Sequence, residues 1–228
     1  MTGTRQLNFV LAERRGLVDE VTEQLCDAIM RGQLTQGERI NEAQVAQILG
    51  VSRAPVREAF ARLCEQGIIE RVANHGAFVV QFTLRDIEEL WSLRNTLEQF
   101  AVSQLIRIGG QVHLELPSHA LNAIQQALAD EADDCQITEL DLSFHEALIL
   151  TLGHTRLYKA WSTLRNQTAI LLHTSIRMDR LYRTKIIEGH RQVLQAIEDQ
   201  DEPRARRLVE QHIEASYTRL AMAFQGTV

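Results

Sequence analysis

The sequence predicts a mainly α protein, in which an N-terminal winged helix-turn-helix is followed by an all-α antiparallel bundle of about six helices. Two observations carry this fold class. Up to about residue 82, short amphipathic segments alternate with glycine turns and end in two strand-like segments. Beyond that point, long stretches with helical periodicity follow one another. We therefore expect two domains, residues 1–82 and 83–228.

Three short helices and a hairpin are expected in the first part. The first helix runs from about Leu17 to Met30, the second covers "NEAQVAQILG" as far as Gly50, and the third runs from its N-cap Ser52 to about Gln66. The segments "IIERV" and "AFVVQF" are typical of short β-strands, and "ANHG" between them can form a tight turn. This order is that of a winged helix-turn-helix.

The second part is predicted to be entirely helical. Its loops are marked by the glycines and proline of "IGGQVHLELPS" and by the polar corner "EDQDEP". The expected helices cover roughly residues 84–107, 118–131, 138–151, 155–178, 184–199 and 201–224. Six consecutive helices with short connections favour an antiparallel bundle.

Composition points to a cytoplasmic protein. Hydrophobic residues make up 45% and charged residues 24%, no apolar run is long enough for a bilayer, and the first residues lack a secretory signal. The three cysteines form no C-x-x-C pair, which disfavours disulfides and thiolate zinc sites. The net charge of −6 disfavours a nucleic-acid partner, but residues 1–82 hold nine arginines against ten acidic residues, so most of the acidity lies elsewhere.

A pair of arginines in "VSRAPVREAFARL" makes the third helix a candidate for reading DNA. Arg53 and Arg57 lie one turn apart near the helix N-terminus, away from its apolar face. This spacing suits guanidinium groups that bond guanine in the major groove, and Ser52 can reach a phosphate. Alternatively, both are solvated surface arginines, with Arg57 or Arg62 paired to Glu58. The order of helix, turn, arginine pair and His-Gly hairpin tip favours DNA binding.

The stretch "GERINEAQVAQILGVSRAPVREAFARLCEQGIIERVANHGAFV" resembles the DNA-binding domain of GntR-family bacterial transcription regulators, over about residues 17–80. The resemblance implies that the arginines of the third helix read bases and that the hairpin tip reaches the minor groove. Some relatives have an arginine where this chain has Ala43, so one DNA contact is either absent here or supplied by Arg39. The implied DNA-contacting residues are Arg39, Ser52, Arg53, Ala54, Arg57, His75 and Gly76.

Four polar residues fall on apolar helix faces in the second part. Asp141 and His145 lie one turn apart in "LDLSFHEALIL", and His190 and His212 each lie in the apolar stripe of a later helix. A single such histidine is usually a hydrogen-bonded core residue. Three histidines and a carboxylate suit a divalent transition metal, which would compensate the buried acid. Zinc is preferred, and nickel, iron or manganese are alternatives with the same ligand types.

The segments "DLSFHEALI", "EGHRQVLQAIEDQD" and "ARRLVEQHIEAS" look like the metal-site segments of the FCD ligand-binding domain found in one branch of GntR regulators. The resemblance covers about residues 84–224 and implies a helical bundle that holds a metal through Asp141, His145, His190 and His212, beside a pocket for a small organic acid. One departure is His154, where the family usually has an asparagine.

Arg94 is a further charge on an apolar helix face. It either pairs with Glu98 four residues on or donates hydrogen bonds to the carboxylate of a ligand. In the FCD domain an arginine in a segment like "LRNTLE" is associated with the effector pocket, which favours ligand binding. Asn166, His173 and Arg177 are further candidates for contacts to the effector.

These observations predict a homodimeric transcription regulator that binds double-stranded operator DNA, senses a small organic acid and has no membrane partner. The protein is not expected to be an enzyme. The alternative from another class is a metal-dependent, hydrolase-like enzyme that uses the same Asp and His residues, with His173 or Glu146 as a base. A third interpretation is a structural zinc site without sensing.

Overall fold

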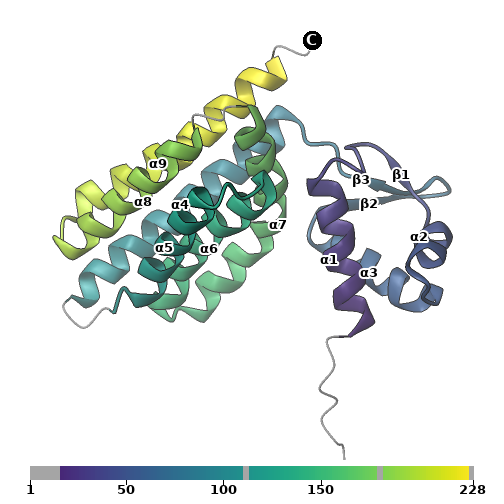
Figure 1. Cartoon of the computed structure of the whole chain (residues 1–228), viewed down its shortest axis with the longest axis horizontal. Helices are drawn as coiled ribbons and strands as arrows, with labels where there is room; N and C mark the ends of the chain where they lie inside the picture. Colours follow the sequence, from purple (N-terminus) through teal and green to yellow (C-terminus); the bar gives the residue numbers. More distant parts are fainter. Residues whose placement is uncertain (1–15, 110–112, 179–181, 226–228) are drawn as a thin grey trace, which may run out of the picture.

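The computed structural model describes residues 16–109, 113–178 and 182–225. Its elements form two groups, a small one with a sheet and a larger one of helices only (Figure 1). The small group consists of α1 (Leu17–Met30), β1 (Arg39–Ile40), α2 (Glu42–Leu49), α3 (Arg53–Glu65), β2 (Ile69–Val72) and β3 (Gly76–Val79). The predicted winged helix-turn-helix is confirmed.

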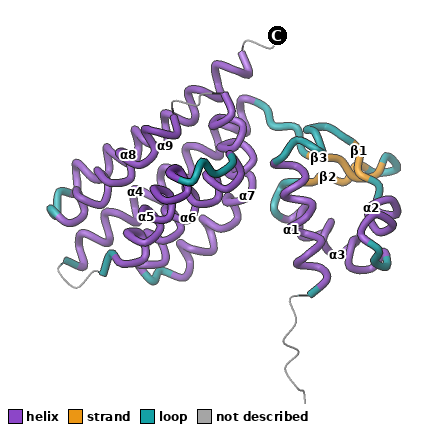
Figure 2. Tube along the Cα trace, in the orientation of Figure 1, coloured by secondary structure: helices purple, strands orange, loops and turns teal. Residues whose placement is uncertain are grey.

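The larger group is the predicted bundle of long helices, which Figure 2 draws as purple segments joined by teal loops. It consists of α4 (Leu84–Ile108), α5 (Glu115–Ala129), α6 (Asp134–Leu152), α7 (Thr155–Met178), α8 (Tyr182–Glu198) and α9 (Glu202–Gln225). Helix α9 packs along α4 and α8, and α5 packs along α6 and α8. Helix α7 packs on α6 and also reaches α1 of the small group.

The wing is a three-stranded antiparallel sheet in the order β1-β3-β2. β3 lies in the middle, with Arg39 opposite Phe78 and Val72 opposite Gly76. The sequence predicted β2 and β3 but not β1. Two residues are too few to show the alternation of polar and apolar side chains by which a strand is recognised.

Side-chain caps set the starts of several helices. Asn41 accepts hydrogen bonds from the backbone N–H groups of Ala43 and Gln44, at 2.9 and 3.3 Å, and so starts α2. Asp133 caps α6 by accepting from Gln136 at 2.8 Å, so that helix begins four residues earlier than its apolar pattern predicted. Ser52 occupies the N-cap position of α3, but its hydroxyl makes no capping bond. The Ser52 side chain therefore leaves the N–H groups at the start of α3 uncapped.

The apolar core of the small group continues into the bundle. Phe60 and Leu63 of α3 belong to the same buried cluster as Leu90 of α4 and Ile170 of α7. The two groups therefore share a hydrophobic interior and are more than neighbours joined by a linker.

Within the described ranges, no helix combines the length and the apolar character that crossing a bilayer requires.

Candidate functional site

The first candidate site is the exposed start of α3. Ser52, Arg53 and Ala54 are exposed, and the Arg57 side chain is 68% exposed. Arg57 lies 3.7 Å from the Glu42 carboxylate at the start of α2, which holds the guanidinium beside the helix without burying it. Both arginines can therefore reach a groove of DNA.

The wing tip lies at the β2–β3 turn. His75 donates its backbone N–H to the carbonyl of Val72 at 3.0 Å, and Asn74 and Gly76 have positive φ values of 63° and 106°. A β-carbon at Gly76 would lie 3.2 Å from Nε of Arg39, so glycine lets the Arg39 side chain pack over the wing. Arg39, His75 and Gly76 are all exposed there.

The alternative that these arginines only form surface ion pairs holds for Arg62 but not for a pair between Arg57 and Glu58. Arg62 lies 3.6 Å from Glu58 and also contacts Asp19, so this arginine has acidic partners within its own domain. Arg57 instead pairs with Glu42, and no ion pair with Glu58 is found for it among the described residues.

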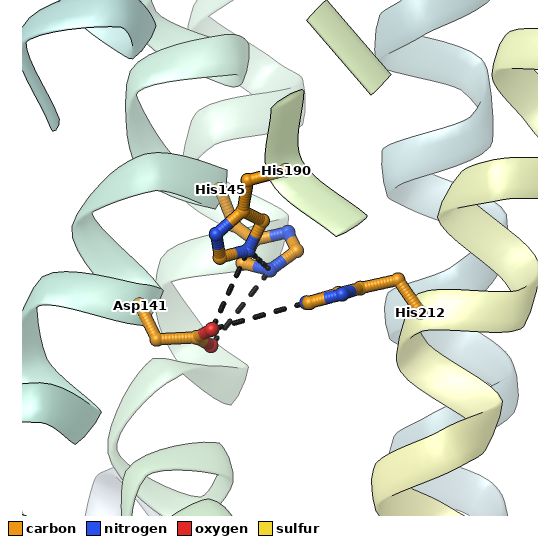
Figure 3. Close-up of side chains that lie close together, drawn as sticks. All are labelled: Asp141, His145, His190 and His212. Atoms are coloured by element: carbon orange, nitrogen blue, oxygen red, sulfur yellow. Dashed lines mark hydrogen bonds and ion pairs between the residues drawn. The ribbon is translucent and has the colours of Figure 1, made fainter. Parts of the chain in front are cut away.

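The second candidate site is a cluster in the bundle formed by Asp141, His145, His190 and His212 (Figure 3). Each residue offers one ligand atom, and these atoms all lie within 4.8 Å of one another. The Nε2 atoms of His190 and His212 lie 3.4 and 3.8 Å from Oδ1 of Asp141. The Nε2 atoms of His145 and His190 are 3.3 Å apart. The structure thus brings together all four residues from three helices.

These distances fit a metal centre. Four ligand atoms placed tetrahedrally at about 2.0–2.1 Å from a zinc ion would lie about 3.4 Å from one another. In the described part of the chain, neither carboxylate oxygen of the buried Asp141 accepts a hydrogen bond. A buried carboxylate without a partner is costly, and a cation among the four ligand atoms would remove that cost.

A second carboxylate, Glu98, orients His145. Its Oε2 lies 2.6 Å from Nδ1 of His145, while its Oε1 accepts from Nε of Arg94 at 2.8 Å and from Nε1 of Trp161 at 2.9 Å. With Nδ1 donating to the carboxylate, the lone pair of His145 Nε2 faces Asp141 and His190. Carboxylates that fix a ligating histidine in this way are usual around protein metal sites.

Burial shifts the cluster toward its uncharged forms. It raises the pKa of the Asp141 carboxyl and lowers the pKa of His190 and His212 well below 6.5, the usual histidine value. Burial also opposes ionisation of Glu98, but Arg94 and His145 outweigh it and hold the pKa of Glu98 below its usual range. Neutral His190 and His212 keep a lone pair free for a divalent ion, and the charge of such an ion would favour the ionised form of Asp141.

Gly189 allows α8 and α9 to pack closely against each other. A β-carbon at this position of α8 would lie 2.9 Å from Nδ1 of His212 on α9. Any larger residue would therefore displace the His212 ring from the cluster.

A narrow apolar pocket lies beside the cluster. Its lining residues with polar groups are Arg94 and Trp91 of α4, Thr168 of α7, and Ser216 and Tyr217 of α9, and the rest of the lining is leucine and isoleucine. Ile213, next to His212 in the chain, is also part of the wall. The buried indole N–H of Trp91 has no hydrogen-bond partner in the described ranges. Arg94 thus makes the expected ion pair with Glu98 and also lines a pocket.

The other effector candidates do not join this pocket. Asn166 donates to the side chain of Gln66 in the small group at 2.9 Å. His173 and Arg177 line a separate groove between α7 and the turn that follows α1. His173 lies 3.4 Å from the Cys135 thiol, and its pKa is lowered by burial and by Arg177.

His154, which departs from the resembled pattern, is exposed at the start of α7. Its Nδ1 accepts a hydrogen bond from the backbone N–H of Leu157 at 3.1 Å. The imidazole therefore performs the capping that an asparagine side chain can perform, and it does not enter the pocket.

Sequence reasoning missed the orienting role of Glu98 and the packing role of Gly189. Glu98 lies four residues from Arg94, a spacing that indicates only an ion pair between the two. A glycine directly before a histidine in an otherwise helical stretch was the available signal for Gly189.

Comparison with known proteins identifies the family. The family model described as bacterial regulatory proteins, gntR family, matches residues 17–79, and the model of the FCD domain matches residues 89–215. The chain belongs to the gntR family of bacterial regulatory proteins. Its helix-turn-helix and bundle are the two matched parts.

Relatives from this family are similar over much of the chain. The gluconate operon transcriptional repressor of Bacillus subtilis is 30% identical over 177 residues, which is 76% of this chain and 72% of that protein. The uncharacterized HTH-type transcriptional regulator YdhC of the same organism is 34% identical over 133 residues, but this match spans 58% of the chain and only 59% of that protein.

Solved structures agree with the fold. That of a GntR transcriptional regulator from Rhodococcus sp. RHA1 superposes with a TM-score of 0.75 at 26% identity, covering 90% of this chain and 98% of that one. E. coli McbR/YncC shares the fold with the same TM-score at 22% identity, covering 94% and 100%. The gntR-family chain is thus a DNA-binding transcription regulator and not an enzyme.

Proposed function

We propose that the protein binds double-stranded operator DNA as a homodimer, and that a small organic acid bound beside a divalent metal ion controls this binding. Residues 1–82 would read DNA, and residues 83–228 would bind the metal and the effector and form the dimer. A cytoplasmic location follows from this role. The observation that carries the proposal is the buried Asp141, whose carboxylate oxygens lie among three histidines without a hydrogen bond in the described part of the chain, next to a pocket that contains Arg94.

DNA reading is assigned to the exposed residues at the start of α3 and on the wing. Arg53 and Arg57 would bond base edges, and the backbone N–H groups behind Ser52, which its side chain does not cap, would donate hydrogen bonds to a phosphate. Ala54 would lie against the DNA, while Arg39, His75 and Gly76 would bring the wing to the minor groove. Their exposure and common position on the small group support this assignment.

The metal is assigned to Asp141, His145, His190 and His212. Zinc fits the three nitrogen atoms and one oxygen atom, and nickel, iron or manganese accept the same ligands. When bound, the ion supplies a positive charge and coordination positions that a carboxylate ligand can use. Glu98 fixes the ring of His145, and Gly189 leaves space for the ring of His212.

The effector is assigned to the pocket between α4, α7 and α9. Arg94 would attract a carboxylate, and the Trp91 indole N–H would donate to it. The apolar remainder of the wall favours an acid with a short carbon skeleton. Asn166, His173 and Arg177 lie on the side of α7 that faces the small group. From there they would influence how the effector changes DNA binding without contacting the effector in this pocket.

A homodimer matches the requirement for two reading heads on a palindromic operator. Leu93 and Phe100 lie seven residues apart on α4 and are 48% and 43% exposed. A second copy that covers this face would bury both side chains. Light scattering coupled to gel filtration would give the mass of a dimer.

A melting-temperature screen tests the proposal. Zinc-loaded and chelated protein would each be mixed with a panel of small organic acids. An acid present at a hundred times its Kd stabilises the native state by about 2.7 kcal/mol, which raises the melting temperature by roughly 5–10 °C. We expect such a shift in the metal-loaded protein, and the same acid should then change the affinity for a DNA duplex selected from a random pool.

A structural zinc site predicts a different result. Chelation would then unfold the bundle, and no acid would shift the melting temperature of the loaded protein. Absence of any bound transition metal after reconstitution would refute the metal assignment itself.

A further inference from the structure

The end of α3 is held by α7, a helix of the other domain. Gln66 is the C-cap residue of α3. Its backbone carbonyl accepts a hydrogen bond from Nε2 of Gln167, and its side-chain Oε1 accepts one from Nδ2 of Asn166, both at 2.9 Å. Two consecutive residues of α7 therefore donate hydrogen bonds to one residue at the end of α3. The start of the same helix carries Arg53 and Arg57.

The residue after this cap makes the close approach feasible. Gly67 has a φ of +65°, a conformation that other residues rarely adopt. A β-carbon there would lie 2.0 Å from Nε2 of Gln167. The amide of Gln167 thus occupies the space of the missing side chain, and the contact is built into the backbone of the small group.

The next residues of α7 belong to the pocket. Thr168, directly after Gln167, lines the pocket that contains Arg94, and so do Leu171 and Leu172 about one turn further on. Because helical residues are fixed to one another by backbone hydrogen bonds at 1.5 Å rise each, a displacement of this turn moves the two donor residues with it.

Another polar contact between the domains is weaker. Arg31, after the end of α1, lies 3.2 Å from Asp133 at the start of α6, and both side chains are about half exposed. Exposed ion pairs contribute little and are screened by salt. The hydrogen bonds to Gln66 are partly buried and directional, so they are better suited to fix an orientation.

We propose that Gln66, Asn166 and Gln167 form a latch that positions α3 for DNA and passes changes at the sensor pocket to it. The three are positioning residues, which touch neither the DNA nor the proposed metal. The part of this inference that concerns the sensor rests on the proposed function. The latched and unlatched arrangements would differ in DNA affinity, so a ligand that favours one of them changes operator binding.

The test compares DNA binding by variants of the full-length protein. Gln66→Met removes the acceptor side chain, and Gln167→Leu removes the donor, each with little change in volume. Affinity for a duplex selected on the parent protein would be measured by fluorescence anisotropy, with Zn²⁺-loaded and with chelated protein. We expect the DNA affinity of each variant to differ about 2- to 12-fold from that of the parent. The ratio of the DNA affinities of Zn²⁺-loaded and chelated protein should move toward one.

Conservative variants separate positioning from simple loss of stability. Gln66→Glu keeps an oxygen acceptor for Asn166 and should retain the parent response. Gln195→Glu adds the same charge at an exposed position of α8, and Gln195→Leu is the matched control for the change from glutamine to leucine. Zn²⁺ stoichiometry and affinity should be the same in all variants.

The latch is overturned if Gln66→Met and Gln167→Leu keep the parent's DNA affinity and the parent's ratio of DNA affinities between Zn²⁺-loaded and chelated protein. A second result would also overturn it. Gln66→Glu would change the DNA affinity as much as Gln66→Met does, after the effect of the added charge, measured with Gln195→Glu, is subtracted. A parent protein that takes up no Zn²⁺ would instead refute the metal part of the proposed function, and the comparison of DNA affinities would still decide on the latch.

Discussion

Replacing Gly189 by alanine should separate the stability of the bundle from its affinity for metal. The added β-carbon would lie 2.9 Å from Nδ1 of His212. Ordinary contact requires about 0.5 Å more, which exceeds the tolerance of roughly 0.2 Å on metal–ligand distances. His212 could then coordinate only with distorted geometry. Since disturbing an outer residue already costs about 10- to 100-fold in metal affinity, we expect Zn²⁺ to bind at least tenfold more weakly.

The same substitution favours the helix itself. Alanine inside a helix is about 0.5–1 kcal/mol more stable than glycine, because glycine loses more conformational freedom on folding. In chelated protein the His212 ring can rotate away from the new methyl group, so the melting temperature should stay equal or rise. The expected signature is unchanged or higher stability without metal together with weaker metal binding.

Competition with a chromophoric zinc chelator measures the affinity, and thermal melts in excess chelator measure the stability. Gln195→Ala is the matched control, because it adds alanine to the exposed face of the same helix away from His212. If Gly189→Ala holds Zn²⁺ as tightly as the parent, the proposed role of His212 as a ligand is wrong. A large loss of stability without metal would show that the ring cannot move and would contradict the reasoning on the helix.

Three further outcomes are expected. Glu98→Gln should weaken Zn²⁺ binding about 10- to 100-fold in the same chelator competition, since an amide orients His145 less well than a carboxylate; unchanged affinity would exclude this role. Arg53→Ala and Arg57→Ala should each cost about 1–3 kcal/mol of operator affinity in anisotropy titrations, and a double variant that binds like the parent would contradict the reading-helix assignment. Because the pKa values of His190 and His212 are lower in the folded protein than 6.5, their contribution to stability is present above pH 6.5 and is lost as the pH falls toward the folded-state values. Urea unfolding of chelated protein from pH 7.5 to 5 should therefore show falling stability, with a shallower slope in His212→Gln; equal slopes would argue against a buried neutral His212.

Most helices could be predicted from periodicity, and the differences have local causes. The start of α6 was missed because Asp133 and Asp134 look like loop residues until the side chain of Asp133 is seen to cap the helix. β1 was missed because its two residues are defined by their pairing with β3, which is a contact distant in sequence.

The metal candidates could be found because each of the four lies in the apolar stripe of its own helix. The effector candidates on α7 could not be assigned in the same way. Asn166, His173 and Arg177 share one face of that helix, and the structure shows that this face looks toward the small group while Thr168, Leu171 and Leu172 line the pocket. Periodicity identifies a face but does not say which neighbour it meets.

The shared interior of the two domains bears on how such regulators can be recombined. Phe60 and Leu63 pack in one cluster with Leu90 and Ile170, so a reading head cut away after residue 82 would expose part of its core. A chimera that joins this head to the bundle of another regulator would need matching side chains on α4 and α7. Although the sequence looks modular, the bundle can be exchanged for that of another regulator only if the apolar side chains between the two domains still fit together.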